Sequence, residues 1–518
     1  MASSFKEQRL TAQQVRDNYR LKFGRVADPL LKAVIVDAIP GDVDGLMPIE
    51  KIGTALKVLI PLWTDRTEFD GFPDKLVLEY YHSGLPDFIP LGPEEDIDYT
   101  VPDGDFPLPR EIPLDIFRSF EGTLQFRYRV TSWNSDQRQA PETPITIDRT
   151  GPIRPESPKA IDIVKPLITD KVLADDGGVK CVVPDFVENK KDFVKVAVGW
   201  MSTLPEDESE FPDLVAFFDL LPSTREILVP ARFIINIGSN THYVVYFLYD
   251  KAFNRSEMSL PRSVQVALGE LPSALLPCTV PLAADGLIDR ADAAFPTTVQ
   301  IEQYTGWDRN DGLVIQWGTK LLARTSVGAH LPFPLQIHMP WLHMREEYDF
   351  TSTTYVQAVD VDYSVYRGDY PTPSPGKISV NTNFAIAGPD NPDPEPINPD
   401  LKLIVFESSE GSDKELTPDD FGKPATGHIA LFDTPAPVIG DALTLYYNGN
   451  AVSPPYVIKA GDGAGTVIPI TIPWVVIEPY QVMDDLPMYY TLTRPGMVFG
   501  SHCVTRRSCV SAMASSSN

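Results

Sequence analysis

The chain is short of cysteine, of long apolar runs and of positive charge, and each shortage excludes a class of protein. It has four cysteines in 518 residues, which are too few for a disulfide framework. No apolar run reaches the roughly 18 residues of a transmembrane helix, and the N-terminus lacks the apolar core of a secretory signal. We therefore expect no disulfide scaffold and no membrane insertion.

Basic residues are scarce relative to acidic ones. The chain has 44 Lys and Arg against 71 Asp and Glu, a formal net charge of −27. Nucleic-acid binding depends on clustered Lys and Arg, so we expect no nucleic-acid partner. An anionic membrane surface would repel the chain for the same reason.

The balance of charge is reversed in the first 25 residues. They hold six basic and two acidic residues, a net charge of +4, which leaves −31 for the rest of the chain. Within residues 5–23, four large apolar side chains recur near helical spacing: Leu10, Val15, Tyr19 and Phe23. We expect a basic N-terminal extension over residues 1–27, helical or disordered. Its charge favours docking on the acidic body or on a partner, and the alternative is a frayed terminus.

Long helices are not expected either, because proline is abundant. The chain has 50 prolines and 33 glycines, and each interior proline removes a helical hydrogen bond and clashes with the preceding turn. Since 43% of the residues are hydrophobic, the composition is that of a folded chain with many short strands and turns. The length suits roughly three to five domains.

Three landmarks recur along the chain in a fixed order. The first is an alternating strand that ends in an aromatic residue: Tyr80, Trp200, Trp317 and Tyr446. The second is an apolar residue followed by proline: Ile112-Pro113, Val229-Pro230, Met339-Pro340 and Ile472-Pro473. The third is a tyrosine followed two residues later by Val or Leu: Tyr128, Tyr246, Tyr363 and Tyr490.

The spacing of the landmarks predicts four repeated units. The tyrosines of the third landmark are separated by 118, 117 and 127 residues, and each first-landmark aromatic precedes its tyrosine by 44 to 48 residues. A fixed period of this kind indicates tandem modules. We place a basic extension and four segments along the chain: 1–27, then segment 1 (28–150), segment 2 (151–270), segment 3 (271–389) and segment 4 (390–518), with a loop insertion near 408–427 in segment 4.

Each landmark has a structural interpretation. Period-two alternation places one face of a strand on a core, and the terminal aromatic would be buried between two sheets. A tyrosine shortly before the last hairpin fixes a corner of a sandwich through its hydroxyl. The aspartates that precede three of the alternating strands, Asp74, Asp311 and Asp441, would close the turn that enters the strand.

About seven short strands per ~120 residues is the pattern of a β-sandwich. The segments, each with an alternating strand that ends in Trp or Tyr and a later Tyr-x-Val strand, resemble the immunoglobulin-like tandem modules of proteobacterial surface and adhesin-type proteins. The resemblance covers most of residues 28–510 and implies an all-β array of four immunoglobulin-like β-sandwiches. The antibody-type Cys…Trp…Cys arrangement is absent, since no cysteine lies near Tyr246 to partner Cys181.

The segments are joined by stretches rich in proline and polar residues, which we expect to be semi-rigid, extended spacers. One of them, residues 388–400, supplies four carboxylates that are weak candidates for a calcium site: Asp390, Asp393, Glu395 and Asp400. Because the intervening prolines hold the carboxylates apart, a solvated acidic linker is the favoured interpretation. We therefore expect no cofactor, with calcium as the open alternative.

No motif singles out a catalytic residue, so the sequence favours a protein that is not an enzyme. The resemblance implies an elongated binding or spacer protein of a bacterial surface, or a secreted adhesin, with a protein or glycan ligand bound by loops at the ends of the sandwiches. A cell-surface or secreted localisation is favoured, with export by a route that needs no recognisable N-terminal signal. A cytoplasmic localisation stays open. Two alternatives remain: a carbohydrate-binding or toxin-associated array, and a glycan-active enzyme with accessory sandwiches. A row of exposed aromatics, with Trp317 and Trp341 to be inspected, would favour glycan binding.

Overall fold

The computed structural model describes residues 28–508, except for 69, 134, 189–190, 414, 481–485, 498–499 and 504–505. The basic extension and Cys509 lie outside the described residues. Strands dominate, and every helix among these described residues is short. None of the helices in the described part of the chain is long and apolar enough to cross a membrane.

Segments 1 and 2 each contain two antiparallel sheets. In segment 1 they are β1-β2-β6 (Val34–Ile35, Leu56–Ile60, Leu108–Ile112) and a sheet of β3 (Asp74–Tyr81), β4 (Ile89–Pro90), β5 (Glu95–Ile97), β7 (Gly122–Thr131), β8 (Gln137–Gln139) and β9 (Thr143–Ile147). In segment 2 they are β10-β12-β15 (Asp162–Ile163, Gly178–Val182, Glu226–Pro230) and β11-β17-β16-β13-β14 (Leu167–Ile168, Arg262–Val266, Asn240–Tyr249, Lys195–Met201, Val215–Leu220).

Segments 3 and 4 repeat this division. In segment 3 the smaller sheet is β19-β23 (Thr298–Ile301, Leu335–His338), and the larger holds β18 (Ile288–Asp289), β26 (Ile378–Asn383), β24 (Gln357–Arg367), β20 (Gly312–Trp317), β21 (Lys320–Leu321), β22 (Thr325–Ser326) and β25 (Tyr370–Pro373). In segment 4 the sheets are β27-β28-β32 (Val405–Glu407, Ala425–Ala430, Val467–Ile472) and β29 (Ala442–Tyr447), β30 (Asn450–Ala451), β31 (Tyr456–Val457), β33 (Leu486–Thr493), β34 (Ser501–His502) and β35 (Arg506–Ser508).

The strand order is that of an immunoglobulin-like sandwich. In segment 2 the chain crosses between the two sheets: β12 pairs with β15 in the smaller sheet, whereas β13 pairs with β16 and β14 in the larger one. The same crossing between sheets occurs in segment 1, where β2 pairs with β6 and β3 pairs with β7. This Greek-key arrangement characterises the immunoglobulin fold. The predicted class, an all-β chain of immunoglobulin-like sandwiches, is confirmed, while the segment boundaries and their number stay predictions.

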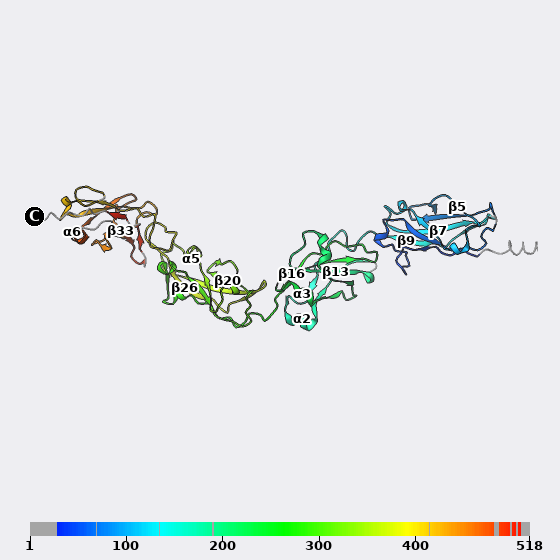
Figure 1. Cartoon of the computed structure of the whole chain (residues 1–518), viewed down its shortest axis with the longest axis horizontal. Helices are drawn as coiled ribbons and strands as arrows, with labels where there is room; N and C mark the ends of the chain where they lie inside the picture. The colour runs from blue at the N-terminus through cyan, green and yellow to red at the C-terminus, as the bar shows by residue number, and fades with distance from the viewer. Residues whose placement is uncertain are drawn as a thin grey trace, which may run out of the picture. The chain divides into compact units, whose positions relative to one another are not determined.

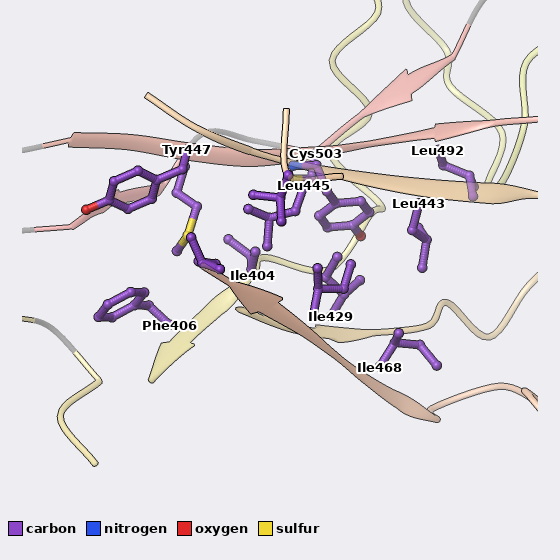
Figure 2. Packing of buried hydrophobic residues seen from close by; sticks show 14 of the residues in the cluster. Ile404, Phe406, Ile429, Leu443, Leu445, Tyr447, Ile468, Leu492 and Cys503 are labelled. Atoms are coloured by element: carbon purple, nitrogen blue, oxygen red, sulfur yellow. The ribbon is translucent and has the colours of Figure 1, made fainter. Parts of the chain in front are cut away.

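Apolar side chains of the two sheets face each other and form the core. Figure 2 shows this for segment 4, where Leu443, Leu445, Tyr447 and Leu492 of one sheet lie opposite Ile404, Phe406, Ile429 and Ile468 of the other. The alternation predicted from the sequence is visible in β32, whose residues are exposed and buried in turn. Comparable cores lie in segments 1 and 3.

The helices are short and connect strands. The α-helices are α2 (Asp170–Asp176), α3 (Ala231–Ile237), α4 (Arg290–Ala293), α5 (Trp341–Glu347) and α6 (Trp474–Ile477). The 3-10 helices are η1 (Ile49–Lys51), η2 (Asp103–Asp105), η3 (Leu114–Ile116), η4 (Lys191–Phe193), η5 (Glu208–Leu214), η6 (Pro281–Ala283), η7 (Val327–Ala329), η8 (Pro418–Asp420) and η9 (Glu478–Tyr480). In segment 2, α3 packs against β12, β13 and β15, and Figure 1 labels it beside β13 and β16.

The apolar-Pro landmark marks one position in every segment. Its apolar residue is buried at or within one residue of the end of a strand of the smaller sheet: Ile112, Val229, Met339 and Ile472. The proline that follows stands directly before a helix, namely η3, α3, α5 or α6. Pro113, Pro340 and Pro473 are N-cap residues with extended backbone, and their φ of −60° to −64° is the value that the proline ring fixes.

Candidate functional site

The third-landmark tyrosines make the same contact in all four segments. Their hydroxyls donate to backbone carbonyls near the start of the segment, 87 to 97 residues earlier. The bonds are Tyr128 to Leu31 O (2.8 Å), Tyr246 to Lys159 O (2.9 Å), Tyr363 to Leu276 O (2.7 Å) and Tyr490 to Lys402 O (3.0 Å). Each tyrosine thereby ties the entry of its segment to the central strand of the larger sheet.

These tyrosines are at most 1% exposed. Burial raises the pKa of Tyr128 to about 12, and it raises the pKa values of Tyr246, Tyr363 and Tyr490 as well. The hydroxyls are therefore neutral donors at physiological pH. A buried hydroxyl needs such a partner, because an unmade hydrogen bond in the interior is costly.

The first-landmark aromatics divide into two groups. Trp200 and Trp317 are buried, and Tyr80 packs half-buried against the core of segment 1. The prediction for Tyr446 was wrong, since that ring lies on the outer face of its sheet and stacks on Tyr489 at 4.9 Å. Its neighbour Tyr447 is the buried residue. Two adjacent tyrosines in a strand point to opposite faces, and the burial of Leu443 and Leu445 assigns the core face to residue 447.

The aspartates that precede the alternating strands are buried anchors. Asp74 accepts hydrogen bonds from the amide nitrogens of Thr67 and Trp133 and from the indole nitrogen of Trp63. This agrees with a turn-closing role, although Asp74 holds two loops rather than one.

In segments 3 and 4 the corresponding aspartate also pairs with an arginine. Asp441 binds Arg494 through both carboxylate oxygens, at 2.7 and 2.8 Å, and Asp311 binds Arg367 in the same two-point manner. Both carboxylates are at most 1% exposed. Each arginine comes four residues after the landmark tyrosine, so an alignment of the repeats would have found it.

The linker at residues 388–400 is not the extended, solvated spacer that the sequence predicts. Asn391 and Asn398 are fully buried. The Asn391 amide donates to the carbonyl oxygens of Glu395 and Ile397, and the Asn398 amide donates to that of Pro389. The prolines keep the backbone from forming a strand, and the two asparagines satisfy the carbonyls that are left.

Arg290, at the start of α4, fixes the same linker from segment 3. Its side chain is fully buried, and it donates to Asn391 O at 3.1 Å, to Phe384 O at 3.3 Å and to Asp393 O. The guanidinium also lies 5.4 Å from the ring centre of Trp341. Burial lowers the pKa of Arg290 to about 10, so the group is still charged at neutral pH and is solvated by carbonyl oxygens in place of water.

The four calcium candidates do not converge. Asp390, Asp393, Glu395 and Asp400 are all exposed, and Asp390 forms an ion pair with Arg345. Within the described ranges, no group of three or more His, Cys, Asp or Glu is arranged to hold a metal ion. The cation that the linker carbonyls surround is the Arg290 guanidinium.

The insertion in segment 4 is organised around Asp420. This fully buried carboxylate accepts hydrogen bonds from the Ser409 hydroxyl (2.7 Å), the Glu410 amide (3.0 Å), and the Thr417 amide and hydroxyl (2.8 and 2.9 Å). Burial alone would raise the pKa of Asp420, but these hydrogen bonds outweigh it and lower the pKa to about 2. Nearby, Phe421 is 60% exposed, and its ring lies 5.1 Å from that of Trp474.

The two tryptophans proposed for a glycan surface do not form one. Trp317 is fully buried. Trp341 is half-buried, its indole nitrogen donates to Pro392 O at 2.7 Å, and its ring packs edge-on against Phe384 at 4.9 Å. Both side chains therefore act within the core or at the linker.

Comparisons with known proteins found similar solved structures at low sequence identity. No protein-family model matches the chain, and no curated protein matches it. Among solved structures, the chain is similar to a Ca²⁺-stabilised adhesin with which an Antarctic bacterium binds ice: 10% identity, 93% of this chain and 100% of that one, TM-score 0.25. It is also similar to a tetra-tandem repeat from the extending region of a large adhesion protein, with 10% identity over 91% of this chain and 98% of that one and a TM-score of 0.23. A third similar structure is an ICAM-5 D1–D4 ectodomain fragment, with 11% identity over 93% of this chain and 100% of that one and a TM-score of 0.25.

Proposed function

We propose that this chain is a non-catalytic, elongated binding and spacer protein that acts at a bacterial cell surface or after secretion. The observation that carries the proposal is the tyrosine–carbonyl bond, which recurs once in each predicted segment. A contact repeated in this way serves a repeated structural unit, and a chain of such units provides length and end loops for binding.

Contacts between neighbouring segments support the spacer role. In segments 1 and 2, Lys251 binds the buried Asp42 carboxylate at 2.6 Å, and the Asn254 amide donates to Asp148 O at 3.0 Å. In segments 3 and 4, Arg290 binds the carbonyls of the linker. Connections held by side chains of both neighbours resist bending better than a free linker does, because the linker no longer keeps its conformational freedom.

The insertion at 408–427 is the best candidate for the binding surface. Loops carried by a rigid scaffold are a common place for binding residues, and the hydrogen bonds to Asp420 hold this loop in one shape. The loop presents the exposed ring of Phe421 beside Trp474. An exposed aromatic ring supported by a partly buried one suits a protein or glycan ligand at a surface.

The proposal is tested by screening the purified chain against a glycan array and against host-cell surfaces. We expect the chain to bind one ligand class. Phe421→Ala should lower the affinity for that ligand at least tenfold, which is the usual effect of losing an aromatic anchor. Val467→Ala, which changes an exposed residue of β32, is the matched control and should bind like the unaltered chain. Glycan cleavage by the chain would contradict the proposal, and so would ligand binding that Phe421→Ala leaves intact and a change elsewhere abolishes.

A further inference from the structure

Segment 2 has an open sheet edge of an unusual kind. Strand β14 is the last strand of its sheet and pairs with β13 on one side. Edge strands are ready to pair with another chain, and proteins commonly block them with proline. Among the edge strands of five or more residues that the structure describes, the others all contain proline: Pro109 in β6, Pro144 in β9, Pro230 in β15 and Pro469 in β32. Strand β14, with the sequence VAFFDL, has none.

Apolar side chains stand beside this edge. Phe218 is 48% exposed and Leu220 is 47% exposed, and alternate residues of a strand share one face. The Phe218 ring packs edge-on against Tyr249 at 5.8 Å, which fixes its orientation. An extended segment that paired with β14 would therefore meet both unsatisfied backbone groups and an apolar surface.

A cavity of about 320 Å³ lies at the beginning of β14. Its apolar lining comes from Trp200, Leu204, Leu214, Val215, Phe233 and Ile237. Glu210 and Asp213 also line the cavity and are exposed. They belong to residues 206–213, a stretch with five acidic residues and no basic one.

The acidic stretch is held on the sheet by a buried aromatic contact. Phe211 packs edge-on against Phe247 at 4.7 Å, and its ring lies where a side chain at Gly199 would have to go. The negative charge is therefore fixed beside the cavity and the strand edge. Its complement is an extended segment in which apolar and basic residues alternate.

The chain carries such a segment in residues 19–25, Tyr-Arg-Leu-Lys-Phe-Gly-Arg. In an extended conformation, Tyr19, Leu21 and Phe23 would share one face, while Arg20 and Lys22 would share the other. The segment contains three basic residues and no acidic one. We propose that residues 19–25 of one copy add as a strand to β14 of a second copy, with an apolar side chain in the cavity and the basic residues attracted by the acidic stretch at residues 206–213.

This contact joins two different surfaces, so each copy keeps one free end. Contacts of this kind form rings where the rotation between copies closes and open assemblies where it does not. A strand of seven residues buries less area than a standard protein interface, so we expect a dissociation constant of about 10 to 100 μM at low salt. The spacing that predicts a helix over residues 5–23 also uses Tyr19 and Phe23, so docking as a strand and formation of the predicted helix exclude each other at these residues.

The test is sedimentation of the full chain from about 1 to 500 μM at low ionic strength. We expect concentration-dependent association that weakens as salt rises, because ionic contacts are screened. The tail variant Arg20→Glu/Lys22→Glu and the edge variant Phe218→Lys should each self-associate at least about tenfold more weakly. Val467→Lys, at an equally exposed position on the proline-containing edge β32, should associate like the unaltered chain. Equal melting temperatures would show that the variants are folded.

Mixing the two variants gives the decisive result. Each retains one intact half of the contact, so an equimolar mixture should form a 1:1 complex that does not grow further. Three results would each overturn the proposal. They are an unaltered chain that stays monomeric at 500 μM, a tail variant that associates like the unaltered chain, and a mixture that stays monomeric. A peptide of residues 17–27 should compete, and equal competition by a scrambled peptide of the same composition would show charge attraction without strand pairing and overturn it too.

Discussion

Two buried tyrosines of segment 4 should respond in opposite ways to the loss of a hydroxyl. Tyr490 and Tyr447 lie on neighbouring strands, β33 and β29, and are at most 1% exposed. The Tyr490 hydroxyl donates to Lys402 O at 3.0 Å, whereas the Tyr447 hydroxyl is buried and has no hydrogen-bond partner among the described residues. Replacing each with phenylalanine removes one oxygen from the same core.

Tyr490→Phe should lower the free energy of unfolding by about 1 kcal/mol, the usual net value of one hydrogen bond. A loss larger than this is not expected, because Lys402 is exposed and water can solvate its carbonyl once the hydroxyl is gone. Tyr447→Phe should be neutral or stabilising by up to about 1 kcal/mol, because it removes a polar atom that is desolvated and unpaired.

Scanning calorimetry of the whole chain measures both effects, and a change of 1 kcal/mol should shift the transition of a unit this size by roughly 4 °C. The transition assigned to segment 4 should move, and the others should not, since units in an array couple mainly to their neighbours. Equal losses for both substitutions would refute the reasoning from the hydroxyl partners. A shift of every transition together would contradict the segment boundaries.

Three further outcomes are expected. Arg290→Met keeps an apolar side chain near Trp341 but removes the charged hydrogen bonds to the linker. It should therefore lower the free energy of unfolding by about 2–4 kcal/mol and speed amide exchange in residues 389–396. Unchanged exchange would show that the linker does not depend on Arg290. Asp420 has a folded pKa of about 2 against an ordinary 3.8, so it contributes about 2 kcal/mol above pH 4 that is lost as the pH falls from about 4 to 2. Asp420→Asn should remove that pH dependence, and a variant with an unaltered acid profile would exclude this role. Millimolar calcium should leave the melting temperature unchanged. A calcium site filled at a hundredfold excess over its dissociation constant would instead add about 2.7 kcal/mol to the free energy of unfolding. A melting temperature that falls with a chelator, and no longer does so in Asp390→Asn/Asp393→Asn, would contradict the account.

The fold was readable from the sequence because its signals are local. Strand alternation, the apolar-Pro pair and the Tyr-x-Val strand each span a few residues and recur at a fixed period. The error at Tyr446 has a local cause as well, since a shift of one residue exchanges the two faces of a strand. The buried run Leu443, Leu445 and Tyr447 would have set the register.

The contacts of Arg290 and Asp420 could not be read in the same way. Arg290 binds carbonyls 94 to 104 residues away, and backbone carbonyls carry no mark in a sequence. Asp420 stands in an acidic, polar insertion where nothing separates it from the exposed Asp419. Its burial depends on how the loop folds back, which is settled by the hydroxyls of Ser409 and Thr417.

The central claim, that the chain is an extended array of sandwich modules, is tested most directly by small-angle X-ray scattering of the monomer at low concentration. Strands of ten or eleven residues such as β7 and β24 give each module a length of roughly 35 Å. Four modules in line would therefore span about 140 Å and have a radius of gyration near 40 Å. A compact domain of 518 residues would have a radius of gyration of about 24 Å. A value near 40 Å is the prediction, and a value near 24 Å would contradict it.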